Sequence, residues 1–136
     1  MKKYIVLVLM IVVLVFGCSQ EKEDSLDQLL DYKETYIGNA SDIGAILVML
    51  DIEHDGIELK TDEEPYGLII NLSKEVDDID YTSACLMMLV DNMSYIEYDY
   101  DDTSIMVERL DIEDKYGYDL RTLVDDKEKL LSVLSE

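Results

Sequence analysis

The stretch 80–93 restricts the fold of this chain most, because it is apolar on nearly every side of a helix. Its apolar side chains are Tyr81, Ala84, Cys85, Leu86, Met87, Met88, Leu89, Val90 and Met93. A helix without a polar face does not lie on the surface of a domain, so we expect this one at the centre of the core. Cys85 is therefore expected to be a buried, unreactive thiol.

On either side of this helix, apolar and polar residues alternate with the period of a half-buried strand. Residues 57–73 are expected to form an antiparallel hairpin whose turn lies at 62–65. A second hairpin is expected from strands at 94–100 and 105–110, joined by a turn at 101–103. Each hairpin has one apolar face to pack against the central helix.

Amphipathic helices are expected before and after this pattern. Residues 41–50 have apolar side chains at helical spacing, with Asn39 or Ser41 as the N-cap. Residues 120–134 have the same spacing and are expected to form one C-terminal helix. The order helix, hairpin, central buried helix, hairpin, C-terminal helix predicts an α+β domain around one antiparallel sheet.

The N-terminus has the three parts of an export signal. Lys2 and Lys3 precede 13 uncharged, mostly apolar residues, which as a helix span roughly 20 Å, short of the ~30 Å hydrocarbon core. The next residues resemble a bacterial lipobox ending at Cys18, which implies cleavage after residue 17 and lipidation of Cys18. An uncleaved signal anchor is the alternative. We therefore expect a signal peptide at 1–17, a tether at 18–27 and a single domain at 28–136, anchored at the outer face of a bacterial plasma membrane.

Charge and motifs exclude several classes of function. The formal net charge is −21, and so negative a surface repels the phosphate backbone of nucleic acids. No nucleotide-binding glycine loop, G-x-S-x-G or zinc spacing occurs, and His54 is the sole imidazole. We expect neither an enzyme nor a cofactor.

Acidic clusters are weak candidates for a metal site. Asp51, Glu53 and Asp55 have the spacing of a calcium loop, but the twelfth position is Asp62 rather than glutamate. Asp99, Asp101 and Asp102 lie at the predicted turn of the second hairpin. A further cluster consists of Asp77, Asp78 and Asp80. Aspartate is common in solvated turns, so we expect no metal site in these segments.

Ten tyrosines, one phenylalanine and no tryptophan make tyrosine the principal aromatic residue. Tyrosine serves both as a contact residue for proteins or sugars and as a core aromatic, and for Tyr66 and Tyr98 we favour the core.

The chain resembles the domain of unknown function 4825 over about residues 28–110, at residues 32–47, 57–61 and 64–68 and at Asp91-Asn92 followed by Tyr95-Ile96. Such domains occur in Gram-positive bacteria on lipoproteins and beside membrane-bound sensor peptidases. The resemblance implies an extracytoplasmic binding module without catalytic residues. Tyr36 and Tyr66 would then be packed anchors or surface contacts, and Gly38 and Gly44 positions of positive φ or close helix approach. The residues that this implies for binding are Tyr36, Gly38, Tyr66 and Gly67.

The sequence therefore favours a ligand- or partner-binding module, with a sensory or regulatory role included. Its partners are expected to be the membrane, through the N-terminal lipid, and a membrane protein or the cell wall. The alternative is an acidic cation-binding or envelope-structural lipoprotein, which depends on the net charge and the aspartate clusters. An enzyme is third, because His54 and the many acids are all that it could use.

Overall fold

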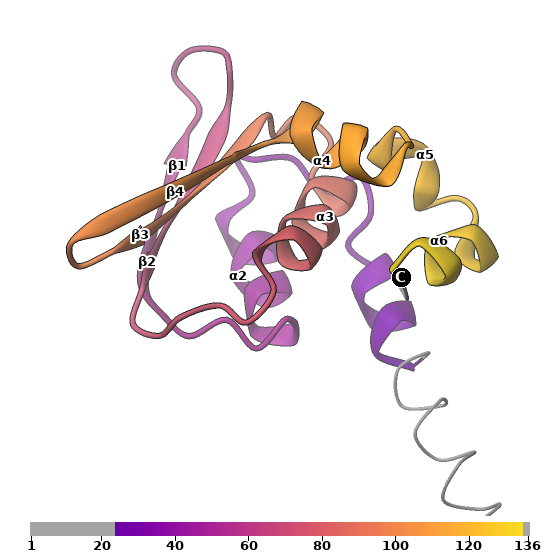
Figure 1. Ribbon diagram of the computed structural model, residues 1–136, viewed down its shortest axis with the longest axis horizontal. Coiled ribbons are helices and arrows are strands. Elements are labelled where there is room, and N and C mark those ends of the chain that lie inside the picture. The colour runs from indigo at the N-terminus through magenta and orange to yellow at the C-terminus, as the bar shows by residue number, and fades with distance from the viewer. Residues whose placement is uncertain (1–23, 135–136) are drawn as a thin grey trace, which may run out of the picture. The chain divides into compact units, whose positions relative to one another are not determined.

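The computed structural model describes residues 24–134, which Figure 1 shows as a coloured ribbon. The chain divides into two compact units, Met1–Asp31 and Tyr32–Glu136. In the first unit residues 24–30 are helical, so this helix begins inside the segment predicted as a tether. The predicted signal peptide and Cys18 lie outside the described residues. Among the described helices, none has both the length and the apolar character needed to cross a bilayer.

The second unit is α+β and contains one four-stranded sheet, in the order β1-β2-β3-β4. Strand β1 (His54–Lys60) pairs antiparallel with β2 (Gly67–Leu72), and β3 (Tyr95–Tyr100) pairs antiparallel with β4 (Thr103–Glu108). Both predicted hairpins are therefore confirmed, and together they form the sheet.

The expectation of a wholly antiparallel sheet is wrong at its centre, where β2 and β3 pair in parallel. The two strands are joined through helix α3 (Ile79–Leu89), which returns the chain to the end of the sheet where β2 began. Parallel neighbours need such a crossover, whereas a hairpin cannot join them. Alternation in the sequence indicates each strand, but it carries no information on how one hairpin pairs with the next.

Helix α3 is buried from Thr82 to Leu89, as its nearly continuous apolar surface predicts. It begins at Asp78, whose side chain accepts a hydrogen bond from the Tyr81 N–H at 3.0 Å. The predicted end at residue 93 is wrong, because the chain becomes extended at Val90. The apolar residues after Leu89 are buried in a loop rather than in a fourth turn of the helix.

Helix α2 (Ala40–Met49) agrees with the helix predicted at 41–50. Of the two N-cap candidates, Asn39 is the cap, and its side chain accepts from the Asp42 N–H at 3.2 Å. Gly44 lies in the middle of this helix with open space where a Cβ would be. The expectation of positive φ or close approach at Gly44 is therefore wrong.

Helix α4 (Arg109–Tyr116) was not predicted, and it follows β4 directly at a position where the strand was expected to reach residue 110. Apart from Arg109, Ile112 is its only buried side chain, so no apolar stripe marks it in the sequence. The helix ends at Gly117, which has φ 76° and whose N–H bonds the Glu113 carbonyl at 2.8 Å.

The single helix predicted at 120–134 is two helices, α5 (Leu120–Leu123) and α6 (Lys127–Leu134). Asp126 lies at the break, where its side chain accepts from the Lys129 N–H at 3.0 Å. An aspartate at this position starts a new helix, because it satisfies a backbone donor that has no partner within the first turn.

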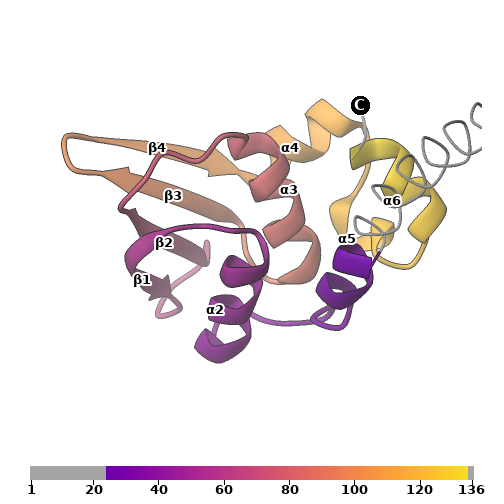
Figure 2. The same cartoon turned by 90° about the horizontal axis from the view of Figure 1, so that it is seen from below.

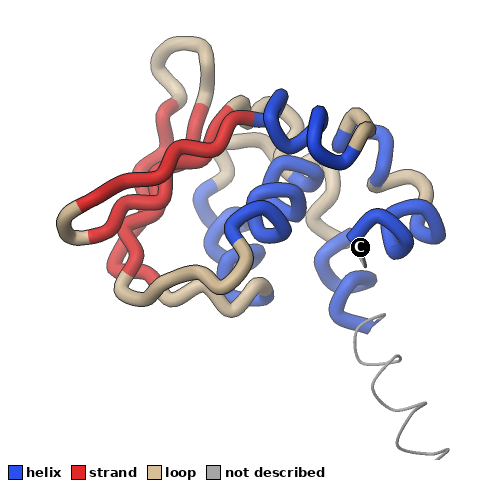
Figure 3. The backbone as a smooth tube through the Cα atoms, viewed as in Figure 1, coloured by secondary structure: helices blue, strands red, loops and turns tan. Residues whose placement is uncertain are grey.

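The core lies between α3 and one face of the sheet, and Figures 2 and 3 show α2 and α3 on this same face. Tyr98 on β3 is fully buried, and its hydroxyl lies 2.8 Å from the hydroxyl of Ser83 on α3. The expectation of a core Tyr98 is confirmed, whereas the same expectation for Tyr66 is wrong, because Tyr66 is only partly buried. Cys85 is also fully buried, and burial raises the pKa of its thiol to about 12, as expected for an unreactive cysteine.

Candidate functional site

A loop at residues 90–94, which follows α3, joins segments that are far apart in the sequence. Thr35 forms a parallel β-bridge with Val90, and the Asp91 N–H donates to the Thr35 carbonyl at 2.9 Å. Two residues along, the Ile37 N–H donates to Asn92 Oδ1 at 2.8 Å. The segment around Thr35 and Ile37 is thereby held against the end of the central helix.

The other end of the same loop holds the segment before β2. The Ser94 N–H donates to the Tyr66 carbonyl at 2.8 Å, next to the first pair of β2 and β3, Gly67 with Tyr95. Residues 35–37, 64–67 and 90–94 therefore meet through backbone hydrogen bonds and the side chain of Asn92. Each of these segments contains residues that carry the resemblance described above.

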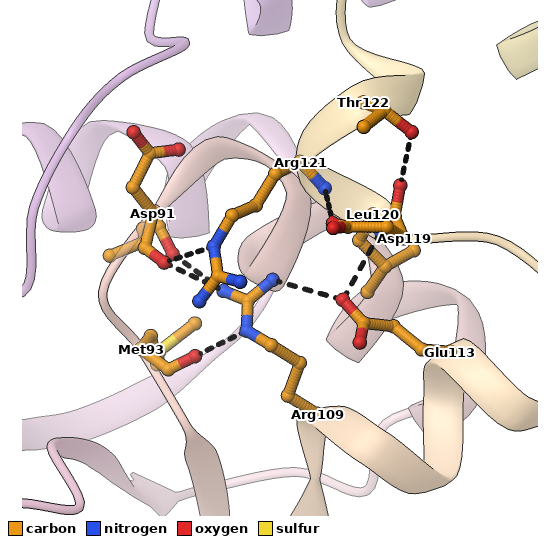
Figure 4. Close-up of polar contacts among 9 residues, drawn as sticks. Asp91, Met93, Arg109, Glu113, Asp119, Leu120, Arg121 and Thr122 are labelled. Carbon is orange, nitrogen blue, oxygen red and sulfur yellow. Dashed lines mark hydrogen bonds and ion pairs between the residues drawn. The ribbon is translucent and has the colours of Figure 1, made fainter.

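Both arginines of the chain bind the carbonyl groups of this loop (Figure 4). Arg109 donates from Nε to the Met93 carbonyl at 2.7 Å and from Nη2 to the Val90 carbonyl at 2.8 Å. Arg121 donates from Nε to the Asp91 carbonyl at 2.8 Å. Because loop carbonyls at the end of a buried helix have no helical partner, these guanidinium groups satisfy them.

The two arginines differ in their surroundings. Arg109 is 5% exposed, and burial, followed by the charge of Arg121, lowers the pKa of its guanidinium. Glu113 opposes this shift from 3.7 Å and also accepts a hydrogen bond from the Leu120 N–H at 3.2 Å. Arginine stays protonated in proteins, so a positive charge lies behind the loop. Arg121 is exposed, and a second positive charge lies at the surface.

A cavity of about 510 Å³ opens between the segment before β2, the 90–94 loop and Arg121. Its lining residues are Glu64, Pro65, Tyr66, Asn92, Ser94 and Arg121. No hydrogen bond among the described residues uses the hydroxyl groups of Tyr66 and Ser94, which can both donate and accept. Glu64 and Arg121 add one charge of each sign, and Pro65 adds an apolar surface. The lining therefore combines polar, charged and apolar groups.

Of the four residues implied for binding, the structure places only Tyr66 in this cavity. Gly67 follows it, and the ring of Tyr95 occupies the space that a Cβ on Gly67 would need. Tyr36 is 59% exposed and lies outside the cavity lining. Its ring would be 3.1 Å from a Cβ on Gly38, which makes Gly38 a position of close side-chain approach rather than of positive φ.

The acidic candidates for a metal site are spread over separate places. Asp51 and Glu53 line a groove of about 290 Å³, where Lys74 forms an ion pair with Glu53 at 3.2 Å. Asp77 and Asp78 line the same groove. The remaining candidates are Asp55 in β1, Asp80 in α3, Asp99 in β3 and Asp101 in the turn after it, and Asp80 forms an ion pair with Lys115. Within residues 24–134, no three His, Cys, Asp or Glu side chains come together as a metal would require.

His54 begins β1, and its Nδ1 atom is buried without a hydrogen-bond partner in the described part of the chain. It lines neither the cavity at Tyr66 nor the acidic groove. The sole imidazole is thus separate from both candidate binding sites.

Sequence analysis did not identify Arg109, Arg121 or Ser94 as parts of a site, and it noted Asn92 only within the resemblance. One signal was available, because these are the only two arginines among 11 basic residues. Arginine is suited to binding several carbonyl groups at once, and lysine cannot replace it there. The convergence of both arginines on one loop still required the fold.

Comparison with known proteins gives one match. The family model described as a domain of unknown function (DUF4825) matches residues 29–113, which is more than half of the chain. The match includes the Thr35 segment, Tyr66, the 90–94 loop and Arg109, and it ends before Arg121. No curated protein and no solved structure matches.

Proposed function

The chain belongs to the DUF4825 family, and on that premise we propose that it is a lipid-anchored extracytoplasmic module that binds a ligand or partner in the cavity at Tyr66. Binding, and not catalysis, is the activity proposed. A sensory or regulatory role follows if occupation of the cavity is detected by a membrane protein.

One observation supports the proposal above all others. The cavity opens where the segments that carry the family resemblance meet, and both arginines of the chain fix the loop between them. Holding a loop by backbone and guanidinium bonds keeps its side chains in place before a ligand arrives. Such preorganisation favours binding, because less conformational entropy is lost on association.

The lining favours a ligand of the peptide class. Ser94, Tyr66 and Asn92 provide hydrogen-bonding groups of the kind that bind amide groups. Glu64 and Arg121 would pair with a basic and an acidic group, and an aromatic ring beside a proline accommodates an apolar side chain. A short segment of a partner protein, or a cell-wall peptide, has these groups together.

Site-specific photocrosslinking in cells would test this function. A photoreactive amino acid would replace Ser94 in the full-length chain, and a matched control would carry it at Val48, which is 76% exposed on α2. We expect an adduct, detected as a discrete mass shift, from position 94 and none from position 48. We also expect Tyr66→Ala to abolish it and Tyr118→Ala, at a tyrosine outside the cavity lining, to leave it unchanged. Absence of an adduct at position 94, or equal adducts at both positions, would contradict the proposed cavity.

A further inference from the structure

Strand β4 ends the sheet on one side, and among the described residues no strand pairs with its outer edge. The Arg109 N–H donates to the Ser94 carbonyl at 2.8 Å, which fixes the phase of the β3–β4 ladder. Since hydrogen-bonded pairs alternate along an antiparallel ladder, Val107 and Ile105 bond inward to β3. The backbone N–H and C=O groups of Ser104 and Met106 therefore point outward.

The two edges of this sheet are protected to different degrees against pairing with a strand of another chain. The opposite edge, β1, contains Asp55, Glu58 and Lys60 and has a register shift between His54 and Gly56. Charges and bulges are the usual means by which an edge strand avoids pairing with another chain. Residues 103–107 of β4 contain no charge, although 32% of the chain is charged. An unprotected edge in so charged a chain is a suitable place for a strand to add.

Exposed apolar side chains accompany this edge. Ile105 is 41% exposed and Met106 is 56% exposed, and they project to opposite faces of the sheet. Leu110, in the first turn of α4, is 69% exposed. An added strand would cover part of the apolar surface on each face while its backbone pairs with Ser104 and Met106.

Acidic residues flank the edge at both ends. Asp101 and Asp102 form the turn before β4, and Glu108 and Asp111 follow its uncharged part. A second copy of this chain would place its own acidic residues beside these in either strand direction, so self-pairing is opposed by charge. The complementary occupant is a strand with basic residues at its ends.

We propose that the outer edge of β4 binds an extended segment of another protein, with an uncharged, β-branched centre flanked by lysine or arginine. The segment adds to the sheet as a fifth strand, through backbone bonds to Ser104 and Met106. This surface is distinct from the cavity at Tyr66, whose lining includes no residue of β4.

The test uses the full-length chain in nonionic detergent and a synthetic peptide of alternating valine and threonine with two lysines at each end. We expect the peptide to slow amide hydrogen exchange at Ser104 and Met106. Met106→Pro removes an outward N–H and breaks no hydrogen bond to β3, and it should weaken binding at least about tenfold. The matched control Met106→Thr keeps that N–H and should bind nearly as well as the unchanged chain. A peptide with glutamate in place of each lysine should bind more weakly, and that difference should shrink at high salt.

Three outcomes would overturn this proposal. One is that the amides of Ser104 and Met106 show no protection at millimolar peptide. Another is that Met106→Pro and Met106→Thr bind alike, which would mean that backbone pairing is not involved. The third is a dimer of the chain in analytical ultracentrifugation that Met106→Pro abolishes, because the occupant would then be a second copy.

Discussion

Arg109 is buried and bonds three loop carbonyls, whereas Arg121 is exposed and bonds one. We expect Arg109→Met to lower the free energy of unfolding by about 3–5 kcal/mol, because it leaves buried carbonyls and Glu113 without their partner. The matched change Arg121→Met should cost about 0.5–1.5 kcal/mol, the value of one hydrogen bond at the surface. Urea unfolding followed by circular dichroism measures both. Equal costs would show that the buried guanidinium is not what holds the loop.

The proposed lipid anchor depends on Cys18, the cysteine of the lipobox-like segment. In cells fed a palmitate analogue, we expect the unchanged chain to be labelled and Cys18→Ala to be unlabelled. Cys85→Ala is the matched control, since that thiol is buried and should take no label. Equal labelling of Cys18→Ala and the unchanged chain would contradict lipidation at Cys18, and absence of label from both chains would favour the signal-anchor alternative.

The buried thiol of Cys85 should also make the stability of the protein depend on pH. Its pKa is about 12 in the folded protein, against roughly 8.5 for an unperturbed thiol, so the neutral form is favoured by folding. The resulting stabilisation is complete below the unfolded pKa and is lost as the pH rises toward the folded one. We expect the free energy of unfolding to fall as the pH rises above about 8.5. Tyrosines ionise near pH 10, so below that pH the fall should come from Cys85 and should be absent in Cys85→Ala. An unchanged slope in Cys85→Ala would mean that other groups cause it.

At the scale of elements, the spacing of apolar residues predicts those helices and strands that have one clear apolar face. Helix α2, both hairpins and the start of α3 were found because their side chains alternate or repeat against a single apolar core. Helix α4 was missed because its only buried apolar side chain is Ile112. The apolar run after Leu89 looked helical, yet the bridge between Thr35 and Val90 competes for its backbone. Tertiary pairing of this kind has no signal in a single segment.

Two glycines, one at the end of a helix and one inside a helix, should change stability in opposite directions when replaced by alanine. Gly117 ends α4 at φ 76°, where a Cβ is strained, so Gly117→Ala should cost about 1 kcal/mol. Gly44 lies inside α2 with open space where the methyl group of an alanine would lie, so Gly44→Ala should stabilise by about 0.5–1 kcal/mol. Thermal unfolding of the two variants should shift the midpoint in opposite directions. Stabilisation by Gly117→Ala would show that α4 does not end in the left-handed conformation.

At the scale of the whole molecule, the candidate site is a product of topology. Tyr66 could be named from sequence through the family resemblance, but its neighbours in the cavity, Asn92, Ser94 and Arg121, come from segments up to 55 positions away. They meet because α3 crosses over to make β2 and β3 parallel, which places the start of both strands at one end of the sheet. Alternation and periodicity do not specify that crossover, so the composition of the cavity was beyond sequence analysis.

The net charge of −21 gives a last prediction, which separates the proposed binding module from a cation-binding protein. Repulsion among like charges destabilises a compact chain, and salt screens it. We expect the unfolding midpoint of the full-length chain to rise as sodium chloride increases from low to physiological concentration. At constant ionic strength, replacing part of the sodium chloride with calcium chloride should change the midpoint by less than about 1 °C, because the acidic side chains of the described residues form no metal cluster. A saturable rise of several degrees with calcium would instead indicate a specific site and favour the cation-binding alternative, since a ligand at 100 times its dissociation constant adds about 2.7 kcal/mol. The double variant Asp51→Asn, Asp77→Asn would then locate that site, because both carboxylates line the acidic groove beside Lys74.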